Sequence, residues 1–258
     1  MKKPLILITN DDGITAPGLR ALVSYMKEIG DVIVVAPDSP QSGMGHAITI
    51  DNTLYSKKVK IDLDDDNTEE YSCSGTPADC VKLGLQEILK KKPDICVSGI
   101  NHGSNSSINV IYSGTMSAAI EAGIEGIPAI GFSLCDFSWE ADFSQAKKFI
   151  QNIVTEALEN GIPPGVVLNV NIPKLHKKEI KGVKICRQAR ANWKEKFDKR
   201  VSPMGKEYYW LTGKFELLDK GEDTDEWALS KGYISVVPTQ FDLTAHHAIQ
   251  TLNNWNLK

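Results

Sequence analysis

Short apolar runs alternate with amphipathic stretches along the first two thirds of the chain. A few consecutive aliphatic residues followed by a turn signal predict a buried parallel strand. We expect such strands at 5–9, 32–35, 95–98, 127–132 and 166–170. Amphipathic spacing, or a proline suited to a first helical turn, predicts helices between them. We expect these helices from Pro17, from Pro77 to Leu89, and over about 115–123 and 143–160. Right-handed crossovers then predict an α/β fold, a parallel sheet sandwiched by helices.

The pattern changes after Pro173. Residues 174–200 are basic and irregular, and Glu-Tyr-Tyr-Trp-Leu-Thr-Gly at 207–213 predicts a β-arm rich in aromatic side chains. A two-stranded extension cannot bury its own face, so we expect the arm to pack on a second subunit. We expect a tail helix at about 248–255 to dock in the same way. The chain is therefore divided into a core, 1–173, and an extension for oligomerisation, 174–258, with β-arm, returning strand and tail helix.

Charge argues against a nucleic-acid backbone as the main partner. The 258 residues carry a formal net charge of -4, and phosphate neutralisation along a nucleic acid needs a surplus of Lys and Arg. The acidic run at 62–66 lacks the Gly and the terminal Glu of an EF-hand, so it predicts a solvated hairpin tip. Any phosphate bound by this chain is expected to be small.

No targeting or membrane segment is predicted. The apolar stretch after Lys3 is shorter than the roughly 7–15 residues of a secretory signal, and no run approaches the roughly 18 of a membrane span. We expect a cytoplasmic protein with no membrane partner. The five cysteines form no C-x-x-C pair, so buried reduced thiols are expected, and core packing is favoured over a nucleophilic role for Cys80.

Two adjacent carboxylates, Asp11 and Asp12, follow the first predicted strand and precede Gly13. The carboxyl ends of parallel strands are where open α/β sheets bind ligands. Two neighbouring carboxylates repel each other unless a cation or a proton lies between them, which favours a metal site. Asp-Asp-Gly is equally typical of an ordinary turn. Taken alone, the motif leaves both interpretations open.

Further polar clusters follow or precede elements of the same sheet. Because parallel strands end at one edge, we expect these clusters to converge there: 9–13, 38–43, 98–105 and 112–115. Oxygen ligands of this kind suit Mg²⁺ or Mn²⁺, and no zinc motif is present. Ser113, Gly114 and Thr115 at a helix start suit a phosphate, although Ser or Thr there is also an ordinary N-cap.

Six segments together resemble the survival protein E (SurE) family of 5′/3′-nucleotidases. They are Ile-Leu-x-Thr-Asn-Asp-Asp-Gly, Ala-Pro-Asp-x-x-x-Ser-Gly, Ser-Gly-Thr-Pro-Ala-Asp-Cys-Val, Val-Ser-Gly-Ile-Asn-x-Gly-x-Asn, Tyr-Ser-Gly-Thr and Asp-x-Thr-Ala, in order from residue 5 to about 246. The resemblance implies a metal-dependent nucleoside monophosphate phosphatase with a Rossmann-like catalytic core over 1–173. It also implies C-terminal elements swapped within a homodimer or homotetramer. The net charge predicts no stable nucleic-acid complex.

Position by position, the resemblance assigns one divalent metal per subunit, Mg²⁺ or Mn²⁺, to a set of four residues: Asp11, Asp12, Ser42 and Asn101. It assigns the phosphate to a second set: Asn105, Ser113, Gly114 and Thr115. His46 falls in a variable part of the pattern and is expected to be a loop hydrogen-bonder.

The predicted reaction is attack on phosphorus by a metal-activated water. One of Asp11 and Asp12 could take the water's proton, and a covalent aspartyl-phosphate is the competing route. Base preference, 5′ against 3′ selectivity and activity on short polyphosphate stay open. A nucleotide-binding protein without turnover and a glycosyltransferase-like use of the sheet edge are the alternatives. Asp242 and His246, four residues apart, are predicted to pair as a structural clasp for the C-terminal segment rather than to act in catalysis.

Overall fold

A nine-stranded sheet forms the body of the protein within residues 3–62, 68–174 and 179–257, which the computed structural model describes. Its order is β3-β4-β2-β1-β5-β6-β7-β11-β8. The strands are β1 (Leu5–Thr9), β2 (Asp31–Pro37), β3 (Ser56–Val59), β4 (Glu69–Cys73), β5 (Ile95–His102), β6 (Ala129–Leu134), β7 (Val166–Ile172), β8 (Val183–Ile185) and β11 (Ile234–Gln240). The six strands from β4 to β7 are mutually parallel, which confirms the predicted α/β class.

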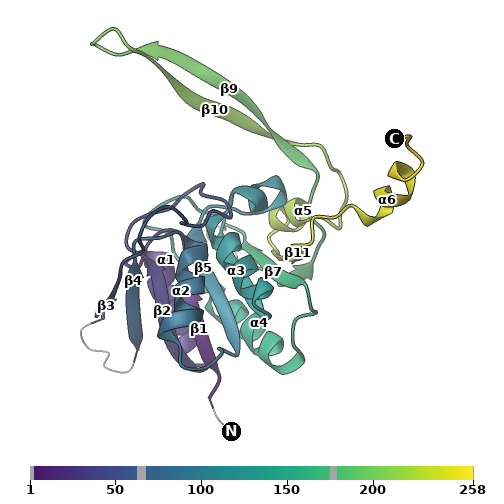
Figure 1. The fold of residues 1–258 in the computed structure, drawn as a ribbon. Coiled ribbons are helices and arrows are strands. Elements are labelled where there is room, and N and C mark those ends of the chain that lie inside the picture. The colour runs from purple at the N-terminus through teal and green to yellow at the C-terminus, as the bar shows by residue number, and fades with distance from the viewer. Residues whose placement is uncertain (1–2, 63–67, 175–178, 258) are drawn as a thin grey trace.

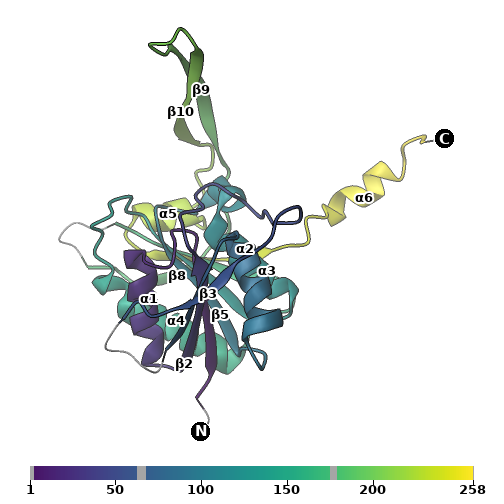
Figure 2. The ribbon, with the colours of Figure 1, turned by 60° about the vertical axis from the view of Figure 1, so that its left-hand side comes forward.

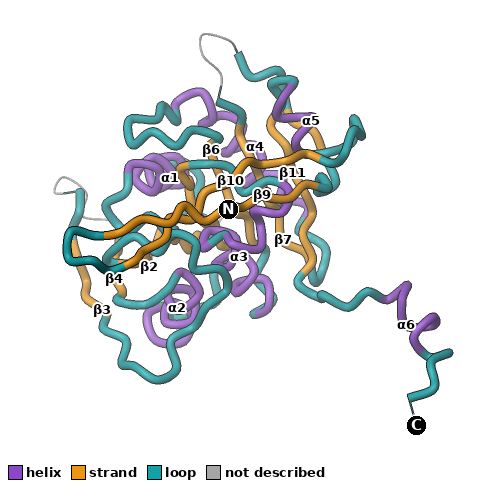
Figure 3. Tube along the Cα trace, turned by 90° about the horizontal axis from the view of Figure 1, so that it is seen from above, coloured by secondary structure: helices purple, strands orange, loops and turns teal. Residues whose placement is uncertain are grey.

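Helices cover both faces of this sheet (Figure 3). The α-helices are α1 (Pro17–Lys27), α2 (Pro77–Leu83), α3 (Gly114–Ile124), α4 (Lys147–Asn160), α5 (Asp225–Ser230) and α6 (His246–Leu252). Shorter turns of helix lie at Gly84–Ile88 (π), Ser107–Tyr112 (3₁₀) and Ser144–Ala146 (3₁₀). The first of these continues α2 to Ile88, one residue before the predicted end at Leu89. In the described part of the chain, no helix is both long and apolar enough to cross a bilayer.

The alternation of side chains along β1 explains the two-sided core. Ile6 and Ile8 pack with Leu22 of α1 on one face, whereas Leu5 and Leu7 pack with α2 and α3 on the other. A strand buried on both faces is apolar throughout, as the run in the sequence is. The sheet is thus fixed between two helical layers, and its carboxyl edge carries the loops.

The C-terminal part completes this sheet and also leaves it. Strand β11 pairs antiparallel with β7, and β8 pairs parallel with β11, so the predicted returning strand belongs to the main sheet. Strands β3 and β4 pair antiparallel as a hairpin on either side of the acidic run that was predicted to be a hairpin tip, and residues 63–67 between them lie outside the described residues. The core and extension of the sequence therefore share one sheet.

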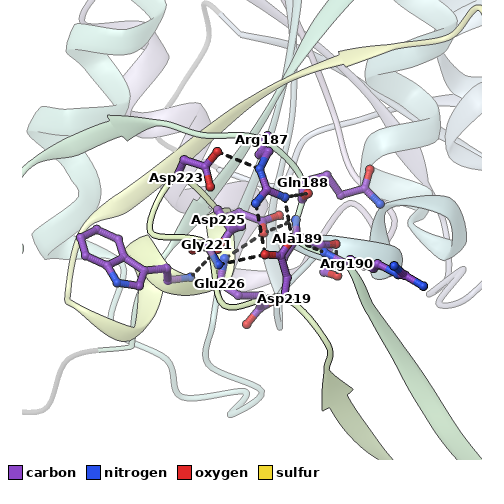
Figure 4. A network of polar contacts seen from close by, with 12 residues as sticks. Arg187, Gln188, Ala189, Arg190, Asp219, Gly221, Asp223, Asp225 and Glu226 are labelled. Atoms are coloured by element: carbon purple, nitrogen blue, oxygen red, sulfur yellow. Dashed lines mark hydrogen bonds and ion pairs between the residues drawn. The ribbon is translucent and has the colours of Figure 1, made fainter. Parts of the chain in front are cut away.

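A two-stranded arm rises away from the body (Figures 1 and 2). It consists of β9 (Ala191–Val201) and β10 (Glu207–Leu217), so it is longer than the sequence predicted and starts within the stretch interpreted as irregular. At the base of the arm, the Arg187 side chain donates hydrogen bonds to Asp219 at 2.5 Å and to Asp223 at 2.8 Å (Figure 4). These contacts join the two ends of the arm.

Helix α6 also stands off the body at the C-terminus, and none of its residues is buried (Figure 2). Apolar side chains along the tail and arm are exposed: Phe197, Trp210, Leu211, Leu243, Ile249, Leu252 and Trp255. Exposed apolar surface of this extent is typical of interaction sites.

Candidate active site

The predicted acidic motif lies at the point where the sheet changes winding direction. Strand β1 has β2 on one side and β5 on the other, and chain connections run outward in both directions from this pair. Asp11 and Asp12 follow β1, and Asn101 is the last residue but one of β5. Open α/β sheets bind ligands in the crevice beside such a pair of strands.

Asp11 is buried against the start of α3. It is 5% exposed, and the hydroxyl of Thr115 donates to its Oδ1 at 2.5 Å. A Cβ on Gly114 would lie 2.6 Å from the Cβ of Asp11, so only glycine permits this approach. Burial, with Asp12 adding repulsion, raises the pKa of Asp11 to about 6. This carboxylate is held in an environment that penalises its charge.

Asp12 faces β5 instead. Its Oδ2 accepts a hydrogen bond of 3.3 Å from the backbone N–H of His102. Burial raises the pKa of Asp12. The hydrogen bond from the His102 backbone and the nearby His102 ring lower this pKa, but by less. The side-chain amide of Asn101 donates to the carbonyl of Gly103 at 2.8 Å, which leaves its Oδ1 as an acceptor. Two carboxylates and one amide oxygen therefore come from the ends of two adjacent strands.

The loop that carries Ser42 is tied to the same motif. The backbone N–H of Gln41 donates to the carbonyl of Asp11 at 2.8 Å, and that of Gly45 donates to Tyr112 at 3.2 Å. Ser42 itself is exposed. The structure thus bonds the residue before Ser42 to Asp11, and the Ser42 side chain is open to solvent.

Ser113, Gly114 and Thr115 form the first turn of α3 beside Asp11. The Ser113 hydroxyl accepts from the backbone N–H of Met116 at 3.0 Å, so it is the N-cap of the helix. The capping role and the predicted phosphate role are compatible, since unpaired N–H groups and the dipole of a helix start attract an anion.

Asn105 is held by a buried polar cluster that the sequence analysis missed. Its side chain donates to Ser133 at 2.8 Å, and Asn171 and Asn169 bond to its backbone N–H and carbonyl. The signal available was the alternation of Asn169 and Asn171 within an otherwise apolar strand, which places both on one face. These three residues position Asn105 at the sheet edge.

Glu121 of α3 is a second residue that the sequence did not reveal. Its side chain is 4% exposed, and it contacts His46 at 2.8 Å and Lys82 at 2.5 Å. His46 is thus a loop hydrogen-bonder, in line with its expected role. The contact fastens the far end of the Ser42 loop to α3.

The remaining predicted residues lie elsewhere. Asp242 and His246 pair at 2.9 Å on the exposed segment before and at the start of α6. Thr244 and His246 lower the pKa of Asp242 to about 2. Figures 1 and 2 show this segment leaving the body, so the pair does not join the residues around Asp11. Cys80 is completely buried among apolar residues.

The donor set fits a hard divalent cation. A buried carboxylate next to a second one is costly without positive charge, and oxygen donors from Asp11, Asp12 and Asn101 are what Mg²⁺ or Mn²⁺ prefers. No group of three or more His, Cys, Asp or Glu suited to a metal occurs among the described residues, so the two acids need neutral oxygen partners such as Asn101 and Ser42. The donor chemistry therefore suits a hard divalent cation in a half-open site rather than in a closed cage.

Comparison with known proteins gives a consistent result. The family model described as survival protein SurE matches residues 6–195. The chain is 72% identical to the 5′-nucleotidase SurE of Flavobacterium johnsoniae, over 99% of this chain and 98% of that protein. It is 44% identical to the 5′-nucleotidase SurE of Bacteroides fragilis, over 99% of each. The crystal structure of a SurE protein from Aquifex aeolicus superposes with a TM-score of 0.83 at 41% identity, covering 97% of this chain and 98% of that one.

Proposed function

Because the chain belongs to the survival protein SurE family, we propose that it is a nucleotidase that hydrolyses nucleoside 5′- and 3′-monophosphates to nucleoside and phosphate. The observation that carries the proposal is the pair Asp11 and Asp12 at the winding change of the sheet, with Asp11 directly against the first turn of α3. A cation site and an anion site adjoin there, as hydrolysis of a phosphate ester requires.

We assign one divalent cation, Mg²⁺ or Mn²⁺, to Asp11, Asp12, Ser42 and Asn101. When bound, such an ion neutralises phosphate charge and lowers the pKa of a coordinated water. The protein contributes position: Thr115 orients Asp11, the backbone of His102 orients Asp12, and the amide contact to Gly103 orients Asn101.

The phosphate is assigned to Asn105 and the first turn of α3. The backbone N–H of Gly114 and the helix dipole supply positive potential without a lysine or arginine, while the backbone of Thr115 bonds to Asp11. As the P–O bond breaks, charge moves to the leaving ribose oxygen, and these fixed dipoles stabilise the remaining oxygens. Asp12 is less buried than Asp11, so we assign to Asp12 the role of the base that accepts the proton of the attacking water.

We further propose that two or four copies assemble through the arm and tail, and that the protein works in the cytoplasm. A two-stranded ribbon with exposed Phe197, Trp210 and Leu211 is marginally stable alone, and α6 has no buried residue. A second copy that exchanges the same elements would cover both surfaces.

Phosphate release tests the proposal. With Mg²⁺ or Mn²⁺ present, the protein should release phosphate from adenosine and guanosine 5′- and 3′-monophosphates, and a chelator should abolish release. Asp12→Asn should lower kcat by at least about a hundredfold, as loss of a general base does. Asp51→Asn, an exposed acid of the neighbouring loop, is the matched control.

Full turnover by Asp12→Asn with saturating metal would refute the assignment. Nucleotide binding without phosphate release would support a sensing protein instead. Short polyphosphate, tested in the same assay, extends or limits the substrate range.

A further inference from the structure

A cavity of about 440 Å³ adjoins the assigned phosphate site. Ser104 and Ser106, which flank Asn105, line one wall, and the ends of β6 and β7 contribute Cys135 and Pro173. The cavity therefore lies at the same carboxyl edge of the sheet as Asp11. Its volume is in the range of pockets for small organic ligands.

Aromatic side chains form another wall. Trp193 and Phe215, from the base of the arm, pack edge to face with ring centroids 5.5 Å apart. The indole N–H of Trp193 donates to Asn109 at 2.8 Å, which fixes the ring. Phe137 is 81% exposed and lies against Gly103 of the loop between Asn101 and Asn105. Flat faces of this kind suit stacking by a heterocyclic ring.

Glu226 supplies a charged group to the same cavity. Its Oε1 accepts from the Ser106 hydroxyl at 2.5 Å, and no hydrogen-bond partner is found for its Oε2 within the described ranges. Burial and the neighbouring Asp225 raise the pKa of this carboxyl. A carboxylate with an available oxygen is the group that commonly accepts hydrogen bonds from ribose hydroxyls.

Asp225 holds Glu226 in place. It is completely buried and accepts from the backbone N–H groups of Ser107 at 2.7 Å and Ala189 at 2.9 Å. Figure 4 shows Asp225 and Glu226 side by side at the base of the arm. The cavity wall is therefore fixed both to the loop after Asn105 and to the start of β9.

The spacing suits a ligand that extends from the phosphate site. Strands β1, β5, β6 and β7 are successive neighbours, and adjacent strands lie about 4.8 Å apart, so the ends of β6 and β7 that line the cavity lie roughly 10 to 14 Å from β1 along the edge. A ribose and base attached to a bound phosphate would reach this distance.

We propose that this cavity is the nucleoside subsite, in which Glu226 accepts a hydrogen bond from a ribose hydroxyl while Trp193 and Phe215 contact the base. The inference rests on the proposed nucleotidase activity and adds the residues that recognise the nucleoside. It predicts that residues at the base of the arm bind the ribose and the base, and that other residues hold the cation and the phosphate.

Glu226→Gln tests the ribose contact, because glutamine can still accept from Ser106 but loses the charge. The KM of adenosine 5′-monophosphate should rise about tenfold, the range of one charge-assisted hydrogen bond. The 2′-deoxy and 3′-deoxy nucleotides identify the hydroxyl, since the analogue without it should show almost no change. Turnover of p-nitrophenyl phosphate, which lacks a ribose, should be unchanged. Glu222→Gln, an exposed acid nearby, is the matched control.

Equal effects of Glu226→Gln on the nucleotide, both deoxy analogues and p-nitrophenyl phosphate would overturn the inference, and so would no effect on any of them. Neither result touches the proposed function. That function fails separately, if the unmodified protein releases no phosphate from nucleotides.

Trp193 provides an independent test. Inhibition by the product adenosine should weaken about tenfold in Trp193→Ala and recover in Trp193→Phe, since stacking on a ring contributes about that much. Trp210→Ala, farther out on the arm, should leave inhibition unchanged. If Trp193→Ala alters the sedimentation coefficient and not the inhibition constant, the cavity is an oligomer contact and the subsite is wrong.

Discussion

The hydroxyl of Thr115 donates a hydrogen bond of 2.5 Å to Oδ1 of Asp11, joining the first turn of α3 to the end of β1. Both residues are buried, and the hydroxyl lowers the pKa of Asp11 against the larger effect of burial. One contact therefore links the assigned cation ligand to the assigned phosphate turn.

Thr115→Val removes this donor with little change in side-chain volume. Asp11 then keeps its burial but loses a compensating bond, so its pKa should rise and divalent cations should bind about tenfold more weakly, since one such bond is worth about 1.5 kcal/mol. Titration of activity with Mn²⁺ measures the change. Thr115→Ser keeps the hydroxyl and should retain most of the affinity; equal affinities in Val and Ser variants would contradict the role of the bond.

Asp11 should make the chelated protein less stable at neutral pH. Its pKa rises from 3.8 to about 6 on folding, so the folded state binds the proton more tightly. That contribution is complete below about pH 4 and is lost as the pH rises through 6. Asp11→Asn, which mimics the protonated form, should be more stable than the unmodified protein at pH 8 by up to about 3 kcal/mol, given about 1.4 kcal/mol per pKa unit.

Denaturant unfolding in the presence of a chelator, at pH 4 and pH 8, measures the difference between the two proteins. Comparing variants cancels the many exposed acids with lowered pKa values, which act in the opposite direction. A difference that does not grow with pH would show that Asp11 is not destabilised when charged. Asp11→Asn should also lose activity.

Glu121→Gln should loosen the loop that carries Ser42. The substitution weakens two contacts of a buried carboxylate, to His46 and Lys82, and should cost about 1–3 kcal/mol of stability. Limited proteolysis should then cut more rapidly within residues 38–50, and the metal concentration needed for half-maximal activity should rise. Glu125→Gln changes an exposed acid one turn away and serves as control. An unchanged rate of proteolysis would show that Glu121 does not hold the Ser42 loop in place.

Double replacement of Asp242 and His246 by alanine should affect assembly. The pair lies on the exposed segment leading into α6, and it fixes the start of a helix that has no buried residue of its own. Sedimentation velocity should show weaker association, while kcat per subunit at high protein concentration changes less than twofold, roughly the effect of a surface substitution. An unchanged sedimentation profile counts against the clasp.

Local pattern was sufficient for the elements of the central sheet. Aliphatic runs bounded by turn residues predicted β1, β2, β5, β6 and β7, because a strand buried on both faces must be apolar throughout. For most of these strands the pattern did not predict where they end. Strand β5 continues to His102 because Asn101 and His102 pair with β6 after a register shift, and such pairing depends on a distant segment.

The arm shows the opposite case. Strand β9 is mostly charged, carries only two aromatic residues, Trp193 and Phe197, and has no buried face, so its sequence looks irregular. It becomes a strand only through eleven-residue pairing with β10.

The sequence by itself determined the chemistry available: two adjacent carboxylates and amide and hydroxyl oxygens beyond apolar strands, and a polar helix start. Tertiary structure decided which of them meet. It placed Thr115 on Asp11, enclosed Asn105 between Asn169 and Asn171, and brought Glu226 from the far end of the chain to Ser106. The reason is physical: residue type and spacing fix local conformation, whereas burial, hydrogen-bond partners and pKa depend on segments that only packing brings together.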